Sequence, residues 1–196
     1  MMNQWFPKWY NRLMYPLEKG SFKQIRTDLI NKASGQVLEL GAGTGINFPL
    51  YKNVTCVTAT EPNPFMIEQS IINQKKAIVP IRIIQSSAEN LPFENDFFDT
   101  VIATLVFCTI PNVEDALNEM HRICKPNGKI LLFEHVKMEQ PILAKMQIYL
   151  TPFWKKICDG CCLDRETVGV LESKGFKIIK LNKFYKGLFV MMEIQN

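Results

Sequence analysis

The stretch Val37-Leu-Glu-Leu-Gly41-Ala-Gly43-Thr-Gly45 holds the strongest structural signal in the chain. Its first four residues have the character of a buried strand, and they run directly into three glycines at alternate positions. A strand that turns sharply needs residues that tolerate unusual backbone dihedrals and lack a Cβ atom, so that a ligand can approach the main chain. We therefore expect a strand at Gln36–Leu40, a ligand-binding loop and a helical stretch after it; a glycine turn that binds nothing is the alternative.

Strand-like and helical segments alternate after this loop. Short links between strands and helices favour parallel neighbours and right-handed crossovers, so the pattern predicts a doubly wound α/β sheet. The last two strands are joined by a link too short for a crossover helix, which predicts an antiparallel last strand in a mostly parallel, seven-stranded sheet. The further strands are expected at Val54–Thr60, Ile81–Gln85, Thr100–Thr104, Lys129–Glu134, Phe176–Leu181 and Gly187–Glu193, and helices at Phe65–Lys75 and Val113–Cys124.

Length and composition indicate one globular domain. Of 196 residues, 47% are hydrophobic and 21% are charged, which is ordinary for a protein with a packed core. The net charge of +4 comes from scattered basic residues, so the sequence predicts no nucleic-acid surface. No apolar run approaches the roughly 20 residues that span a bilayer, and the start does not resemble a signal peptide, which predicts a cytoplasmic protein.

We expect a helical cap at residues 1–35 before the main body at 36–196. The cap is aromatic, and three interpretations stay open: a lid over the site, a helix packed on the body, or a peripheral contact with a membrane. Its large apolar residues are Trp5, Phe6, Trp9, Tyr10, Met14, Tyr15 and Leu17.

The six cysteines do not predict a metal site. Cys158-Asp-Gly-Cys161-Cys162 is the one grouping with ligand-like spacing, and a zinc site would need a second pair of ligands. His121 is expected in a helix and His135 at a strand end. Cys56, Cys108 and Cys124 lie in apolar segments, where a free thiol behaves as a small buried hydrophobe.

The spacing of the glycines narrows the choice of ligand. A dinucleotide-binding fingerprint would place its third glycine at position 46, which is Ile here. The loop is therefore less suited to a pyrophosphate, and this argues against a nicotinamide oxidoreductase. S-adenosylmethionine (SAM) carries no phosphate, so the early third glycine is compatible with a SAM site.

Two later segments are expected to reach the same ligand. Glu61 ends the second strand beside the glycine loop, where a carboxylate can accept hydrogen bonds from both ribose hydroxyls; an exposed Glu that starts a turn is the alternative. The loop from Ser86 to Phe93 follows the third strand and is expected over the adenine, with Ser87 and the backbone of Ala88 near the base. Asp99 is expected to stabilise the entry to the fourth strand.

These motifs together resemble the class I SAM-dependent methyltransferases. The resemblance rests on Leu38–Gly45, Glu61, Ala88–Phe93, Phe98-Asp99 and Gly128–Glu134, and the style is closest to the UbiE-like branch of phospholipid, quinone and small-molecule methylases. The family often has Asp where Ser87 stands. The resemblance implies the cofactor SAM, with contacts from Glu39, Gly41, Ala42, Gly43, Gly45, Glu61, Pro62, Ser87, Ala88, Glu89 and Thr104. In particular, Thr104 would offer its carbonyl to the ammonium of SAM, and Glu39 would help to orient the same group.

A second resemblance concerns the acceptor. Phe133-Glu-His-Val136, followed by Asp159-Gly-Cys161 and Arg165-Glu166, is similar to methyltransferase-like proteins that include microsomal alkyl-thiol methyltransferases. This implies a small apolar acceptor, an alkyl thiol or a lipid-like molecule. Quinone-precursor or phospholipid methylation is the alternative, and a non-catalytic SAM-binding sensor or interaction protein is an alternative of another class.

Methyl transfer from a sulfonium needs a base only where the acceptor must lose a proton. The candidate catalytic residues are Glu134, His135 and Asp159, which are expected near the carboxyl edge of the sheet. For His135 the alternative is simple packing at the strand end, and for Asp159 it is an ion pair with Arg165.

Overall fold

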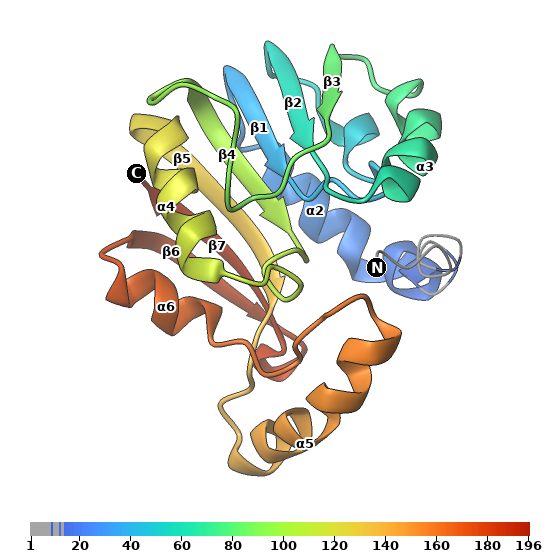
Figure 1. Cartoon of the computed structure of the whole chain (residues 1–196), viewed down its shortest axis with the longest axis vertical. Coiled ribbons are helices and arrows are strands. Elements are labelled where there is room, and N and C mark those ends of the chain that lie inside the picture. The colour runs from blue at the N-terminus through green and yellow to red at the C-terminus, as the bar shows by residue number, and fades with distance from the viewer. Residues whose placement is uncertain (1–8, 10–11, 13) are drawn as a thin grey trace.

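The computed structural model describes residues 9, 12 and 14–196. Within these residues the chain forms one seven-stranded sheet with the strand order β3-β2-β1-β4-β5-β7-β6 (Figure 1). β7 runs antiparallel to both of its neighbours, and all other neighbouring strands are parallel, as predicted. The strands are β1 Gln36–Leu40, β2 Cys56–Thr60, β3 Ile81–Ile84, β4 Phe98–Thr104, β5 Cys124–His135, β6 Lys177–Phe184 and β7 Phe189–Gln195.

Helices cover both faces of this sheet. The α-helices are α2 Lys23–Ile30, α3 Pro64–Gln74, α4 Val113–Ile123, α5 Pro141–Ile157 and α6 Thr167–Ser173; a π-helical turn η1 Glu18–Phe22 precedes α2, and the 3₁₀ turns are η2 Phe48–Leu50 and η3 Tyr185–Gly187. Two of the helices begin with a capping asparagine: the Asn63 side chain accepts from Phe65 N in α3, and that of Asn112 accepts from Asp115 N in α4. Pro64 occupies the first turn of α3, where a missing N–H costs nothing.

Several predicted strand boundaries differ from the structure by one or two residues, and the largest differences are in β5 and β6. β5 begins at Cys124, five residues before the expected Lys129, with a register shift relative to β4. β6 continues to Phe184, so the link to β7 is shorter than expected.

The expected helix after the glycine loop is absent from residues 41–50, which the structure describes as turns and the short η2. Here the backbone bonds span three residues, from Phe48 N to Gly45 O and from Leu50 N to Asn47 O. Pro49 has no N–H to continue an α-helical ladder, so the segment closes as a 3₁₀ turn.

The helix α5 was not predicted from the sequence at all. Its inward face carries Ala144, Gln147 and Thr151 instead of an apolar stripe, and Pro152 lies within it. Gln147 attaches the helix to the body, because its amide donates to Val136 O and Leu163 O and accepts from Met138 N. Figure 1 shows α5 beyond the carboxyl ends of the parallel strands, on the side where ligands bind in such sheets.

The core consists of two apolar clusters, one on each face of the sheet. One cluster joins α4 and α6 to β4 and β5, through residues such as Leu117, Met120 and Leu171. The other joins α2 to the strands and to the segment after the glycine loop, through Phe22, Leu29 and Phe48 among others. The segment after the glycine loop therefore packs in the same cluster as the N-terminal helix α2.

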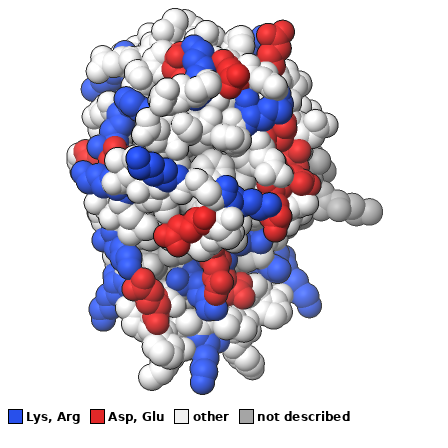
Figure 2. All heavy atoms as spheres, turned by 90° about the vertical axis from the view of Figure 1, so that its left-hand side faces the viewer, with Lys and Arg blue, Asp and Glu red and all other residues white. Residues whose placement is uncertain are grey.

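The described part of the N-terminal segment packs on the body from Phe22 onward, while Trp9 and Tyr15 are exposed. Trp5, Phe6 and Tyr10 lie outside the described residues, so the cap at 1–35 and its contact with a membrane stay predictions. None of the helices in the described residues is both long and apolar enough to cross a bilayer. On the face drawn in Figure 2, acidic and basic side chains are interspersed.

Arg26 of α2 is the buried cation that ties the N-terminal segment to the sheet. Its side chain is 2% exposed and forms an ion pair with Glu18 at 3.0 Å. Its Nη1 atom also donates to Thr104 Oγ1 at 2.7 Å and to Asn47 Oδ1 at 3.2 Å. The guanidinium thus connects three segments that are far apart in the chain.

We predict that Arg26→Met destabilises the protein by about 3 kcal/mol, because it leaves Glu18 without its buried partner. The measurement is urea unfolding, with Lys23→Met on the exposed side of the same helix as the matched control. Equal stability of the two variants would contradict the role of this cation.

Candidate active site

The glycine loop combines crowded and open positions. Gly41, Gly43 and Gly45 have φ values of 58°, 55° and 69°, in the region that favours glycine. A Cβ atom on Gly41 would lie 1.8 Å from Val106 Cγ2, and one on Gly45 would lie 2.5 Å from Phe48. A Cβ atom on Gly43 would meet nothing within 4 Å. Gly41 and Gly45 are therefore needed for packing, whereas Gly43 faces the space in which a ligand can approach the backbone.

Glu61 lies immediately after β2, directly beside this open position. One carboxylate oxygen accepts from Gly43 N and the other from Asn63 N, both at 2.9 Å. The pKa of Glu61 is raised above its ordinary value, mainly because the carboxyl is buried. The two backbone hydrogen bonds lower it, and the negative charge of Asp159 adds to the increase. Each carboxylate oxygen has two lone pairs, so both can accept another hydrogen bond. Pro62 follows and is exposed.

Glu39 of β1 lies at the centre of a buried polar network beneath the loop. Its two oxygens accept from Asn47 Nδ2 and from the Tyr51 hydroxyl, each at 2.8 Å. Burial raises the pKa of Glu39 to about 7, against the lowering effects of these two hydrogen bonds and of Arg26. Asn47 also donates to Thr104 Oγ1 at 2.9 Å, which joins the ends of β1 and β4.

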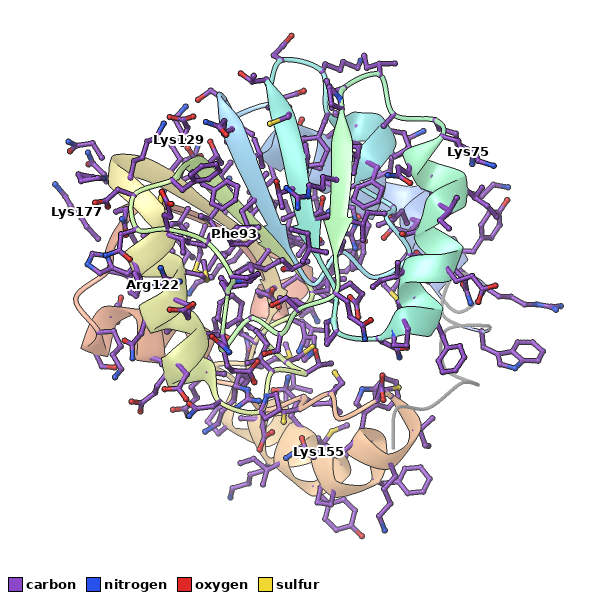
Figure 3. All side chains as sticks on the ribbon, turned by 45° about the horizontal axis from the view of Figure 1, so that its top comes forward. Lys75, Phe93, Arg122, Lys129, Lys155 and Lys177 are labelled. Atoms are coloured by element: carbon purple, nitrogen blue, oxygen red, sulfur yellow. The ribbon has the colours of Figure 1, made fainter. Side chains whose placement is uncertain are left out.

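The expected adenine loop is fixed from the neighbouring helix α4. Arg122 donates to the carbonyls of Phe93 and Leu91 at 2.7 and 3.1 Å, and Glu119 accepts from Leu91 N (Figure 3). Ser87, Ala88 and Glu89 precede this anchored stretch and are half-buried. Glu89 accepts from Asn112 N at 3.5 Å. The family often has Asp at the position of Ser87. Its place near the base stays a prediction.

The candidate Glu134 is fully buried and supports the backbone of the turn after β4. Its oxygens accept from Val106 N at 3.0 Å and from Phe107 N at 3.2 Å. Burial raises its pKa to about 7, against the lowering effects of these bonds and of His135. This carboxylate therefore fixes the turn that precedes Cys108, and its role as a base stays a prediction.

His135, the last residue of β5, lies in a sulfur-rich corner. Its Nε2 atom is 3.2 Å from Cys161 Sγ, and the ligand atoms of Cys108, His135 and Cys161 all lie within 4.8 Å of one another. The hydrogen bond from Cys108 lowers the pKa of Cys161 to about 5, with a further contribution from His135, although burial acts in the opposite direction. This corner therefore brings two thiols and an imidazole together at the carboxyl edge of the sheet.

Asp159 is half-buried in the loop that also carries Cys161. Its negative charge contributes to the raised pKa of Glu61. The described residues show no ion pair between Asp159 and Arg165, which was the alternative; Arg165 instead donates to Ile110 O at 2.9 Å and to Cys162 Sγ at 3.5 Å.

Sequence analysis missed Asn47, Tyr51, Arg26 and Cys108 as members of the site. The first three surround Glu39; Asn47 and Tyr51 are isolated polar side chains in the otherwise apolar segment after the glycine loop, and Arg26 comes from α2, so no local pattern marked them. Cys108 was expected to be a buried hydrophobe, because only the fold brings it to residues 135 and 161.

Comparisons with known proteins agree with this geometry. The family described as "Methyltransferase domain" matches residues 38–132. Thiol S-methyltransferase TMT1B of Homo sapiens is 33% identical over 179 residues, which cover 88% of this chain and 72% of that protein. Phosphatidylethanolamine N-methyltransferase of Cereibacter sphaeroides is 29% identical over 63% of this chain and 62% of that protein.

The fold is also that of solved methyltransferases. A SAM-dependent methyltransferase of Thermotoga maritima matches with a TM-score of 0.71 and 19% identity, covering 98% of this chain and 99% of that chain. The chain belongs to the class I SAM-dependent methyltransferases. It is therefore an enzyme whose cofactor is SAM, and within the class its similarity to TMT1B extends over most of both chains.

The buried Glu39 predicts a pH-dependent stability. Because its pKa is raised in the folded state, the folded protein holds a proton between about pH 4.5 and pH 7 that the unfolded chain has lost. Stability therefore falls as the pH rises through this window, by on the order of 3 kcal/mol for this one group.

Glu39→Gln cannot ionise, so its melting temperature should fall less than that of the wild type between pH 5 and pH 8. Glu68→Gln, which removes an exposed carboxylate of α3, is the control and should follow the wild type. Parallel curves for wild type and Glu39→Gln would count against a raised pKa.

Proposed function

We propose that the enzyme transfers the methyl group of SAM to the sulfur of a small apolar thiol. The observation that carries this proposal is the similarity to a thiol S-methyltransferase over 88% of the chain. This similarity covers the part of the chain expected to bind SAM and also most of the other segments at the carboxyl edge of the sheet. The sulfur-rich corner at His135 and Cys161 supports the proposal, because it provides a place for the acceptor sulfur.

For SAM, we assign the ribose to Glu61 and the close backbone approach to Gly43. The two oxygens of Glu61 keep acceptor capacity beyond their bonds to Gly43 N and Asn63 N, so that they can receive the ribose hydroxyls. Glu39 and the Thr104 carbonyl are the assigned partners of the SAM ammonium. The remaining contacts are assigned to Gly41, Ala42, Gly45, Pro62, Ser87, Ala88 and Glu89.

The reaction is an in-line displacement on an already activated methyl group. The protein's main contribution is to align the acceptor with the methyl carbon and to exclude water. A thiol must also lose its proton, since the thiolate is the nucleophile. Among the catalytic candidates, we assign His135 and Asp159 to the side of the acceptor, whereas Glu134 accepts from the backbone of residues 106–107.

Phospholipid N-methylation is the second candidate. It rests on the similarity to phosphatidylethanolamine N-methyltransferase, which covers 63% of the chain. An amine acceptor would make less use of a sulfur-rich corner, so the thiol is the first choice.

Glu61→Gln should weaken SAM binding by about 1–3 kcal/mol, because one acceptor oxygen for the ribose is replaced by a donor. Isothermal titration calorimetry with SAM measures this, and Glu68→Gln is the control. A melting curve checks that the loop bonds of Glu61 are not lost together with the fold. Unchanged affinity in a folded Glu61→Gln would remove the ribose assignment.

The acceptor is tested with a panel of alkyl thiols, phenols and phosphatidylethanolamine, by following S-adenosylhomocysteine formation. We expect turnover with apolar alkyl thiols above that with the other two classes. Turnover confined to phosphatidylethanolamine would instead favour the second candidate, and failure of every thiol would overturn the first.

A further inference from the structure

The sulfur-rich corner is assembled from three distant parts of the chain. Cys108 follows β4, His135 ends β5, and Cys161 lies in the loop after α5; their ligand atoms are all within 4.8 Å of one another. Several sulfur atoms are visible between the sheet and α5 in Figure 3. No residue spacing within one segment reveals this arrangement.

The corner is built on fixed backbone. Glu134 holds the turn before Cys108, and Cys162 N donates to Cys108 O at 2.9 Å, which joins the two cysteine-bearing segments. His135 is only 9% exposed, and its buried Nδ1 atom has no hydrogen-bond partner among the residues that the structure describes. Nε2, which is 3.2 Å from Cys161 Sγ, is the nitrogen that a cation shared with the two thiols would use.

The donor set and its spacing fit a soft divalent cation. Zinc takes thiolate sulfur at about 2.3 Å and imidazole nitrogen at about 2.0 Å, so a nitrogen and a sulfur ligand of a tetrahedral ion lie about 3.5 Å apart. The separation of 3.2 Å between His135 Nε2 and Cys161 Sγ is compatible with that geometry. Three protein ligands with one position left for water or substrate is the pattern of catalytic zinc sites.

We propose that Cys108, His135 and Cys161 bind a zinc-like divalent cation whose fourth ligand is the sulfur of the methyl acceptor. The catalytic part of this inference rests on the proposed thiol methylation, whereas the metal site does not. The prediction that the chain holds no metal site considered Cys161 without Cys108, because the two are 53 positions apart in the sequence.

The location of the corner suits the delivery of a sulfur atom to SAM. Cys108 follows the carboxyl end of β4 and His135 is the last residue of β5, so the corner lies at the same edge of the sheet as Gly43 and Glu61, which follow β1 and β2. A ligand on the open side of the ion would therefore lie at the carboxyl edge of the sheet, next to the cofactor.

The chemistry balances without an oxidant or a reductant. Coordination favours the thiolate, so the acceptor thiol releases its proton to solvent and forms a sulfur–metal bond. A lone pair of that sulfur then forms the new bond to the methyl carbon, and the carbon–sulfonium bond breaks with its electron pair returning to the cofactor sulfur. The products are a neutral thioether, which is a weak ligand and leaves the metal, and S-adenosylhomocysteine.

The metal site is tested by loading the chelator-treated protein with Co²⁺ as a spectroscopic substitute for zinc. The wild type should bind one equivalent and show sulfur-to-cobalt charge-transfer absorption, which added Zn²⁺ abolishes. Cys108→Ser and Cys161→Ser should each weaken binding by at least about 100-fold, since even outer partners of metal ligands are worth 10–100-fold. Cys56→Ser, on β2 and outside the corner, is the matched control and should bind like the wild type.

A second measurement needs no variant and so is independent of their folding. Zn²⁺ should protect Cys161 of the wild type from iodoacetamide, as read by mass spectrometry, while Cys56 is modified equally with and without metal. Wild-type protein that binds neither ion, or that binds Co²⁺ without sulfur bands, would overturn the site.

The catalytic part has its own readout. Removal of the metal should reduce thiol methylation while SAM affinity measured by calorimetry is retained, and Zn²⁺ should restore turnover. Equal thiol methylation with and without metal would overturn the catalytic role and leave the proposed function intact. Metal binding with no methylation of any thiol would instead overturn the proposed function and leave the metal site intact.

Discussion

The carboxylate of Glu39 is buried at the end of β1, and much of the cofactor side of the molecule is arranged around it. Burying a charge is costly unless it is paired and hydrogen-bonded; Asn47, Tyr51 and the nearby Arg26 reduce that cost only in part, so the pKa of Glu39 stays raised to about 7. Because Arg26 comes from α2 and Asn47 from the segment after the glycine loop, the network fixes both relative to the sheet. The loop can then present Gly43 to a ligand while its other glycines are packed.

The corner of Cys108, His135 and Cys161 depends on a different kind of constraint. There the end of β5 and the loop after α5 meet the turn that follows β4, and backbone hydrogen bonds to Glu134 and between Cys162 and Cys108 hold them together. The Glu39 network lies beneath a glycine loop that the sequence reveals, whereas no single segment of the sequence reveals this corner.

This difference explains how far the sequence could predict each part. The mostly parallel seven-stranded sheet, the reversed β7, the glycine loop and the position of Glu61 beside it follow from local patterns, and the structure has them where they were expected. The helix α5 was missed because its inward face is polar. The prediction of a helix after the glycine loop was wrong because Pro49 limits that segment to a 3₁₀ turn. Cys108 was assigned to the core, since its proximity to Cys161 exists only once the sheet and α5 are in place.

The ends of β5 and β7 also limit how this enzyme can change. Glu134 and His135 are adjacent at the end of β5 and pair with Val190 and Phe189 of β7. Because adjacent side chains of a strand point to opposite faces of the sheet, the two residues contact different neighbours. An inserted or deleted residue here would exchange both faces at once. Substitutions in the loop around Asp159 would leave this strand pairing unchanged, whereas a change in the length of β5 would not.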